Sequence, residues 1–165
     1  MTAFVIICLV ENRVTLDKNL QNSLNRAIDY LAKTYDTIEN DDVYAQALLT
    51  YAFHRANHPQ RTEAISKLEG LATIEDGFKF WRVALEDFER ENPWTQLPNS
   101  ANIEMTSHAL LSHFLADDNG QKFDETIPVV EWLFSQQTTG GGKASIMECI
   151  ISSFWLIFSV RKISM

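Results

Sequence analysis

Histidines and paired carboxylates are the side chains of this 165-residue chain whose types and spacing suit acid–base or metal chemistry. His54 and His58 lie four residues apart, the spacing at which two helical side chains share a face and could bind a metal. Zinc proteases place a glutamate after the first histidine, but Arg55 stands there, and no third ligand follows at a fixed spacing. We therefore interpret this pair as a solvated helix end.

A second histidine pair, His108 and His113, has a spacing that separates the two rings. Five residues place them about 140° apart around a helix, so they should not converge on one ligand. We expect one buried, hydrogen-bonded histidine and one near the surface.

Two pairs of adjacent carboxylates, Asp41-Asp42 and Asp117-Asp118, could serve a hydrolase or cyclase as general acid, base or metal ligand. Neither pair extends to an Asp-Asp-x-x-Asp pattern. Asp42 precedes an expected helix, whose dipole favours an acid at that end. Asp117-Asp118-Asn119-Gly120 is typical of a helix exit and turn. We predict structural roles for both pairs, and we assign no catalytic, cofactor-binding or metal-ligating residue.

The remaining polar and special residues have simple structural interpretations. The acidic run Glu86–Glu91 is typical of a solvated face. The glycines at Gly140–Gly142 lack the spacing of a phosphate-binding loop and should end a helix. Cys8 and Cys149 are too few for a disulfide scaffold, and we expect Cys8 to be a buried free thiol.

The charge and hydropathy of the chain argue against nucleic-acid binding, a signal peptide and a membrane-spanning segment. The formal net charge of −8 disfavours binding to nucleic acid. The apolar start MTAFVIICLV has no basic segment before it and no small-residue cleavage site after it, so we expect no signal peptide in this chain. The apolar run Ile150–Val160 has eleven residues, too few to span a membrane.

Apolar residues follow two alternating patterns along the chain, and this alternation predicts the fold. Segments that are apolar on nearly all sides alternate with segments that carry one apolar stripe. A helix of the first kind must be covered all round. The sequence therefore predicts an all-α fold, a partial α/α toroid of repeated helix hairpins with inner and outer helices. The expected inner helices are 2–10, 43–56 and 103–115, and the expected outer helices are 16–33, 60–72 and 124–137.

Each outer helix should turn a defined stripe towards the core. Ser100 or Asn102 is the expected N-cap of the third inner helix. Pro128 is expected in the first turn of the last outer helix, where its missing N–H is no loss. The expected stripes are Leu16, Leu20, Leu24, Ile28 and Leu31; then Ala64, Ile65, Leu68, Leu71 and Ala72; then Ile127, Val130, Leu133 and Phe134.

Residues 74–101 interrupt the alternation. Glu75-Asp76-Gly77 is typical of a turn, and Phe78, Phe80 and Trp81 follow it closely. We expect a surface excursion with a short hairpin, held by its aromatic side chains against one end of the helices.

Four segments of the chain carry a family likeness: VYAQALLTYAF (Val43–Phe53), DGFKFW (Asp76–Trp81), NIEMTSHALLSHFL (Asn102–Leu115) and IPVVEWLFSQQTTGG (Ile127–Gly141). In this order they resemble parts of the thioester-bearing helical domain of the α2-macroglobulin/complement family. Within this family, the sequences of these segments are most similar to arthropod thioester-containing proteins and to the lipid-anchored macroglobulin of vertebrate cell surfaces. The resemblance implies an α/α toroid within a secreted protein that inhibits endopeptidases by trapping or acts as an innate-immune opsonin.

The chain departs from this family in two ways. The family forms an internal thioester within a Cys-Gly-Glu-Gln sequence, which does not occur here, and neither Cys8 nor Cys149 has that context. The resemblance places the thioester upstream of Met1. From Lys143 onward the family pattern is lost, so we expect a toroid-like domain over 1–142 and a divergent apolar tail over 143–165.

The resulting hypothesis is a fragment of an extracellular thioester protein that acts as a scaffold. It would need no cofactor and have no enzymatic activity of its own. Its expected partners are the other macroglobulin domains of the parent protein and, through the parent, target proteases or microbial surfaces. Two alternatives stay open at this point: an α/α-toroid enzyme such as a glycoside hydrolase, and a helical-repeat interaction module.

Overall fold

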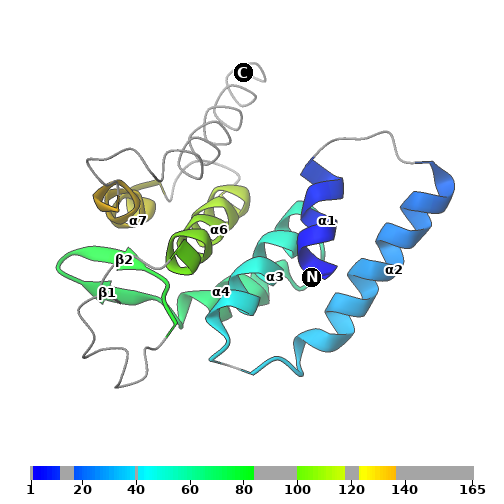
Figure 1. The fold of residues 1–165 in the computed structure, drawn as a ribbon, viewed down its shortest axis with the longest axis horizontal. Coiled ribbons are helices and arrows are strands. Elements are labelled where there is room, and N and C mark those ends of the chain that lie inside the picture. Colours follow the sequence, from blue (N-terminus) through cyan, green and yellow to red (C-terminus); the bar gives the residue numbers. More distant parts are fainter. Residues whose placement is uncertain (1, 12–16, 40, 84–99, 118–122, 137–165) are drawn as a thin grey trace, which may run out of the picture.

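The computed structural model describes residues 2–11, 17–39, 41–83, 100–117 and 123–136. These residues form six helices and one two-stranded antiparallel hairpin (Figure 1). The mostly helical architecture is therefore confirmed. The helices are α1 (Thr2–Glu11), α2 (Lys18–Tyr35), α3 (Val43–Arg55), α4 (Arg61–Glu69), α6 (Ser100–Ala116) and α7 (Phe123–Ser135), and the strands are β1 (Thr73–Glu75) and β2 (Phe78–Phe80).

Helices α1, α3 and α6 form a row, with α3 packed between the other two. Side-chain contacts give the direction of each helix. The Tyr44 hydroxyl, at the start of α3, donates to Glu104 near the start of α6 at 3.0 Å. Arg55, at the end of α3, pairs with Glu11 at the end of α1. The three helices of the row therefore run parallel.

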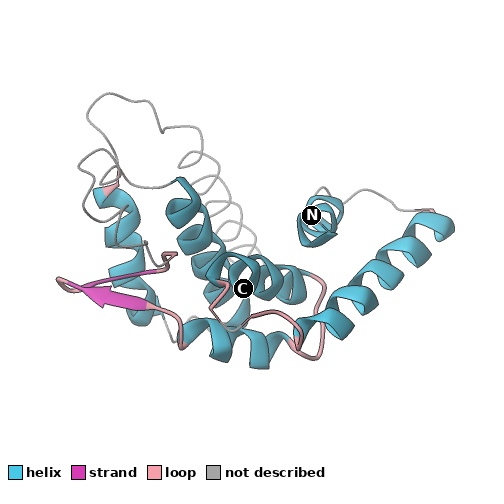
Figure 2. Cartoon of the chain, turned by 60° about the horizontal axis from the view of Figure 1, so that its bottom comes forward, coloured by secondary structure: helices cyan, strands magenta, loops and turns pink. Residues whose placement is uncertain are grey.

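The other three helices flank this row. Figure 2 shows the helices from a second side, with the strand hairpin at one edge. Helix α2 packs against α1 and α3, α4 packs against α3 and α6, and α7 packs against α6 and strand β2. This is the predicted arrangement of inner and outer helices. Closure of the row into a complete ring remains a prediction.

The inner helices differ in how much of their surface is buried. Helix α3 is buried on nearly all sides, as predicted, because it has neighbours on every flank. Helix α1 is not: Phe4 and Val5 are 53% and 50% exposed, since α1 ends the described row. On α2, Leu24 and Leu31 are buried as expected, but Leu20 is exposed. The buried residues of α3 are Val43, Gln46, Ala47, Leu49, Thr50, Tyr51, Ala52, Phe53 and His54.

The predicted inward face of α7 is partly wrong. Leu133 is buried, but Ile127 and Phe134 are 39% and 52% exposed. The helix is rotated because Trp132 stacks on Phe80 of the hairpin, with ring centroids 4.7 Å apart and planes 6° from parallel. The buried residues of α7 are Thr126, Val129, Trp132 and Leu133.

Two expectations about helix starts are also wrong. Helix α6 begins at Ser100, so neither Ser100 nor Asn102 precedes it as a cap. Helix α7 begins at Phe123, one residue before the expected start, but Pro128 lies inside the helix instead of in its first turn. Helix α6 extends further towards the N-terminus than its apolar pattern indicates, because polar residues also form its first turn.

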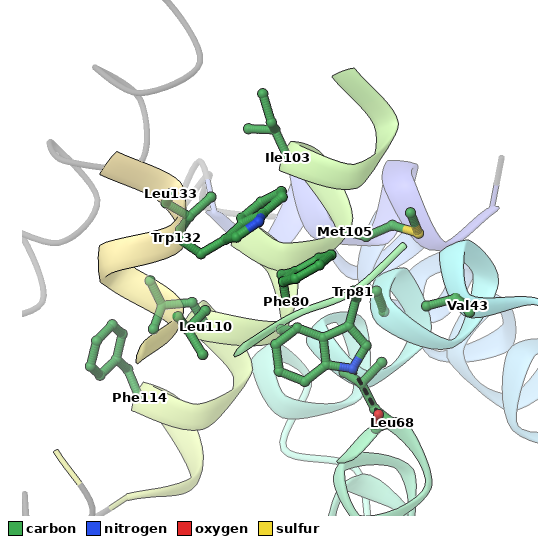
Figure 3. Close-up of a cluster of buried hydrophobic side chains, with 13 residues drawn as sticks. Val43, Leu68, Phe80, Trp81, Ile103, Met105, Leu110, Phe114, Trp132 and Leu133 are labelled. Atoms are coloured by element: carbon green, nitrogen blue, oxygen red, sulfur yellow. Dashed lines mark hydrogen bonds between the residues drawn. The ribbon is translucent and has the colours of Figure 1, made fainter. Parts of the chain in front are cut away.

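The expected hairpin is present and lies against the helices by its aromatic side chains. Asp76 and Gly77 both have positive φ, 52° and 82°, which is the geometry of a two-residue type I′ turn. Beyond β2, Trp81 is fully buried in a core cluster shared by the hairpin, α3, α4, α6 and α7 (Figure 3). In the described part of the 74–101 segment, residues 74–83 and 100–101, Phe80 and Trp81 thus belong to the core, whereas Ile74 at its start is 74% exposed.

Candidate functional site

His54 and His58 do not form the solvated helix end predicted for them. His54 is only 9% exposed, so that prediction is wrong for it. The His58 N–H donates to the Phe53 carbonyl at 2.9 Å, and its ring stacks on the Phe53 ring with centroids 4.8 Å apart. Asn57 between them has φ of 52°, so this end of α3 is a Schellman motif with asparagine in the left-handed position.

His108 has the buried, hydrogen-bonded role predicted for one member of the second pair. Its Nδ1 atom lies 2.9 Å from the Glu104 carbonyl oxygen, and its ring lies 5.4 Å from that of Tyr51. Burial lowers the pKa of His108 and outweighs the opposing effect of nearby Glu104. The ring is therefore held in its neutral form as part of the packing between α3 and α6.

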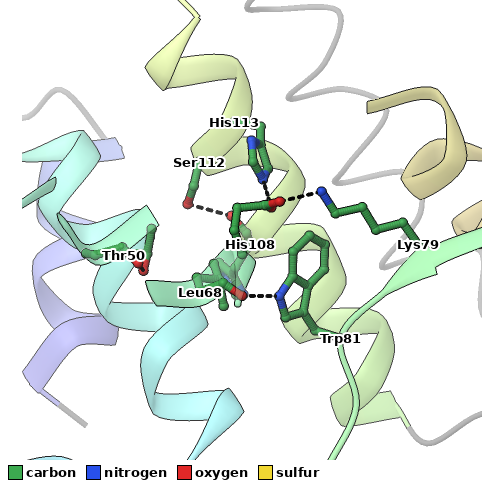
Figure 4. A network of polar contacts seen from close by, with 9 residues as sticks. Thr50, Leu68, Lys79, Trp81, His108, Ser112 and His113 are labelled. Atoms are coloured by element: carbon green, nitrogen blue, oxygen red, sulfur yellow. Dashed lines mark hydrogen bonds and ion pairs between the residues drawn. The ribbon is translucent and has the colours of Figure 1, made fainter. Parts of the chain in front are cut away.

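His113 belongs to a polar cluster that links α4, α6 and the hairpin (Figure 4). Its Nε2 atom lies 2.6 Å from Glu69 Oε1, and Lys79 Nζ lies 2.5 Å from Glu69 Oε2. Burial alone would raise the pKa of Glu69, but hydrogen bonds and charges from His113 and Lys79 outweigh it and lower the pKa to about 2. We name Glu69, Lys79 and His113 the hairpin clasp, because they tie strand β2 to two helices.

Trp81, next to the hairpin clasp, makes a second set of hydrogen bonds to α4 and α6. Its indole Nε1–H donates to the Leu68 carbonyl at 2.8 Å, and its backbone N–H donates to Thr106 Oγ1 at 3.0 Å. Sequence reasoning identified Trp81 as an anchor but missed the clasp. Glu69 and His113 are 44 residues apart, and no local pattern relates them.

Another polar cluster joins the C-terminal ends of α1 and α3. Glu11 accepts a hydrogen bond from the Tyr51 hydroxyl and one from Arg55 Nη2 at 3.0 Å, and Arg55 Nε lies 2.8 Å from Glu11 Oε1. Burial, followed by the contact with Glu11, raises the pKa of Tyr51, so its hydroxyl stays protonated as a donor. This cluster fixes the register of two inner helices.

The described members of the two carboxylate pairs lie apart. Asp42 Oδ1 accepts the Ala45 N–H at 2.9 Å, which confirms its position at the start of a helix. Asp117 follows the last residue of α6, as predicted for a helix exit, and Asp118 lies outside the described residues. Because α3 and α6 run parallel, Asp42 and Asp117 lie at opposite ends of helices that are ~20 Å long.

Cys8 is half-buried, less than predicted. The residues 86–91, 140–142 and 149 lie outside the described part of the chain. Among the described residues, no group of three His, Cys, Asp or Glu side chains could hold a metal ion. None of the helices described is both long and apolar enough to cross a membrane. The polar clusters are internally paired and tie structural elements together.

The described residues form a mostly helical domain, in which parallel inner helices pack against one another and outer helices flank them. Residues 1–152 match the family described as the A-macroglobulin TED domain, and the chain belongs to that family.

Several proteins contain a region that is similar in sequence to this chain. The chain is 31% identical to A. superbus venom factor 2 of Austrelaps superbus over 144 residues, which is 86% of this chain and 7% of that protein. It is 27% identical to thioester-containing protein 1 allele R1 of Anopheles gambiae, over 99% of this chain and 11% of that protein. Ovostatin of Gallus gallus is 25% identical over 92% of this chain and 10% of its own length. The chain thus spans about a tenth or less of these relatives.

Proposed function

We propose that this chain acts as a scaffold section of the TED domain in a larger, extracellular α2-macroglobulin-like protein. The single observation that supports this most is the row of three parallel inner helices, α1, α3 and α6, in a chain that belongs to the TED family. The whole protein would inhibit endopeptidases or opsonise microbes. We propose that the other macroglobulin domains of the parent are the partners of this section.

The chain itself is proposed to carry no acyl-transfer chemistry. No Cys-Gly-Glu-Gln sequence occurs in its 165 residues. The alternative of a glycoside hydrolase needs two carboxyl groups about 5–10 Å apart across a sugar. Asp42 caps α3 and Asp117 follows α6 at the far end, which favours the scaffold over the enzyme. We retain the division into a domain over 1–142 and a divergent tail over 143–165 as part of the proposal.

The first experiment examines the endogenous protein. An antibody raised against α2 captures it from extracellular fluid and from cell lysate, after incubation with isotope-labelled methylamine. We expect a protein of much more than 18.9 kDa in the extracellular fraction, with no label on any peptide from residues 1–165. A label on these peptides would overturn the scaffold role. A free 18.9 kDa protein confined to the lysate would overturn the proposal of a larger, extracellular parent protein.

The second experiment addresses the enzyme alternative. The purified chain and its Asp42→Asn variant are compared on a panel of aryl glycosides. We expect no turnover by either protein. Hydrolysis by the wild-type chain that the variant lacks would favour the hydrolase, provided that far-UV circular dichroism shows both proteins equally folded.

A further inference from the structure

The tip of the β1–β2 hairpin holds an aspartate that is followed by a glycine. Asp76 and Gly77 are the two central residues of the type I′ turn, and both are exposed. A Cβ built on Gly77 would meet no atom within 4 Å, so nothing crowds its backbone nitrogen. Among the described residues, none forms a hydrogen bond or an ion pair with the Asp76 carboxyl. The side chain and the nitrogen that follows it are thus both accessible.

These two residues can react with each other, with water as the only other reactant. The Gly77 backbone nitrogen attacks Cγ of the protonated Asp76 carboxyl, and a C–N bond forms. The amide proton and the carboxyl hydroxyl leave together as water, and a five-membered succinimide ring remains. Water then opens the ring at one of its two carbonyls. Opening at the main-chain carbonyl leaves the chain running through Cβ and Cγ, which is a β-aspartyl linkage one methylene longer than before.

The closed turn keeps the reacting atoms apart. Asp76 has φ of 52°, and the first central residue of a type I′ turn has ψ of about +30°. In an L-residue this ψ places Cβ and the following nitrogen on nearly opposite sides of the Cα–C bond, so a five-membered ring cannot close. The attack therefore requires the turn to open. Opening also breaks the pairing of Glu75 with Phe78 across the hairpin.

Contacts between the hairpin and the helices resist this opening. Phe80 stacks on Trp132, and the hairpin clasp holds Lys79 between α4 and α6. Trp81 donates its indole N–H to the Leu68 carbonyl (Figure 3). All three contacts involve strand β2 or the residue directly after it, so they hold one strand of the hairpin in place. The turn can open freely only when β2 leaves the helices.

We propose that the Asp76–Gly77 bond is a site of isoaspartate formation, which the attachment of the hairpin to the helices protects. Detachment exposes the bond to reaction, and the product retains the detached state. A chain that is one methylene longer cannot form the two-residue turn, so the register that pairs Thr73 with Phe80 is lost. This covalent modification goes beyond the scaffold function and does not depend on it.

The test follows β-aspartyl formation during incubation at neutral pH. Full-length wild type, Trp81→Phe and Leu24→Ala are compared with a synthetic peptide of residues 71–83. After digestion, chromatography separates the two peptides of equal mass, and electron-transfer fragmentation identifies the β-aspartyl form. Leu24 is the matched control, because it is buried in a core cluster separate from that of Trp81. The exposed Asp29, which precedes the bulky Tyr30, is an internal control.

We expect the peptide to convert fastest, and Trp81→Phe to convert at least five-fold faster than wild type. Leu24→Ala should stay within two-fold of wild type, and Asp29 should not convert.

Three outcomes would overturn the proposal. Conversion of wild type as fast as the peptide would show that the folded turn gives no protection. A Trp81→Phe protein that stays unmodified while the peptide converts would exclude the site. Equal acceleration by Leu24→Ala would show that global unfolding, and not detachment of the hairpin, controls the reaction. If circular dichroism shows that Trp81→Phe does not fold, Lys79→Met replaces it, since this variant breaks the hairpin clasp and leaves Trp81 unchanged. The same acceleration is expected, and its absence refutes the proposal.

Discussion

Replacing Trp81 by phenylalanine should measure how strongly the hairpin is tied to the helices. Trp81 is fully buried, and its Nε1–H donates to the Leu68 carbonyl at 2.8 Å. Phenylalanine keeps one ring and loses the donor. The Leu68 carbonyl also accepts the Leu71 N–H at 3.0 Å, so it is not left without a partner. The lost hydrogen bond should therefore cost about 1 kcal/mol.

The volume of the missing ring adds to this cost. A buried large-to-small substitution leaves a cavity, and a partial truncation of this kind should cost about 1–2 kcal/mol. The total expected for Trp81→Phe is about 2–3 kcal/mol in the free energy of unfolding. For a domain of this size, that corresponds to a decrease in Tm of about 5–10 °C.

The assay is urea and thermal unfolding followed by far-UV circular dichroism, because other tryptophans such as Trp132 would confuse a fluorescence signal. The matched control is Arg82→Ala, the next residue, whose pair with Glu75 lies on the surface and should contribute less than about 1 kcal/mol. A Trp81→Phe protein within about 0.5 kcal/mol of wild type would refute the reasoning. So would a larger loss for Arg82→Ala.

Two further predictions concern buried polar groups. The folded pKa of Glu69, about 2, lies below its usual 4.5, so the stability it provides is fully present above about pH 4.5 and is lost as the pH falls towards 2. Its side chain is 35% exposed, which reduces the expected contribution to about 1 kcal/mol, and Glu69→Gln should flatten the pH dependence of the urea midpoint in that window. Gln46 is fully buried, and among the described residues neither polar atom of its amide has a hydrogen-bond partner. Gln46→Met should raise the free energy of unfolding by about 1–2 kcal/mol, and an equal or lower urea midpoint would contradict this.

Local sequence pattern predicted the elements whose signal lies within a few residues. The Glu75-Asp76-Gly77 turn is present because only residues that tolerate positive φ can form a type I′ hairpin. Asp42 caps α3 through a contact only three residues long. The sorting of helices into inner and outer members was also predictable, because the width of the apolar surface reports how many neighbours a helix needs.

Contacts between distant segments escaped prediction because no local pattern encodes them. Glu11 binds Tyr51 and Arg55 some forty residues away, and the sequence around it indicates only a charged helix end. The hairpin clasp unites Glu69 with Lys79 and His113 in the same way. Such pairs become visible only when the packing of α3, α4 and α6 brings the helices into register.

The sequence by itself determined a mostly helical chain of alternating inner and outer helices, with a hairpin between the second and third pairs. These features depend on periodicity and turn chemistry, which are local. Tertiary structure decided which of two adjoining apolar faces α7 buries. Its helix offers both Ile127 with Phe134 and Val129 with Trp132, and the stack of Trp132 on Phe80 selects the second. The stack joins segments about fifty residues apart in the sequence. The buried face of α7 is therefore decided only when the chain is folded.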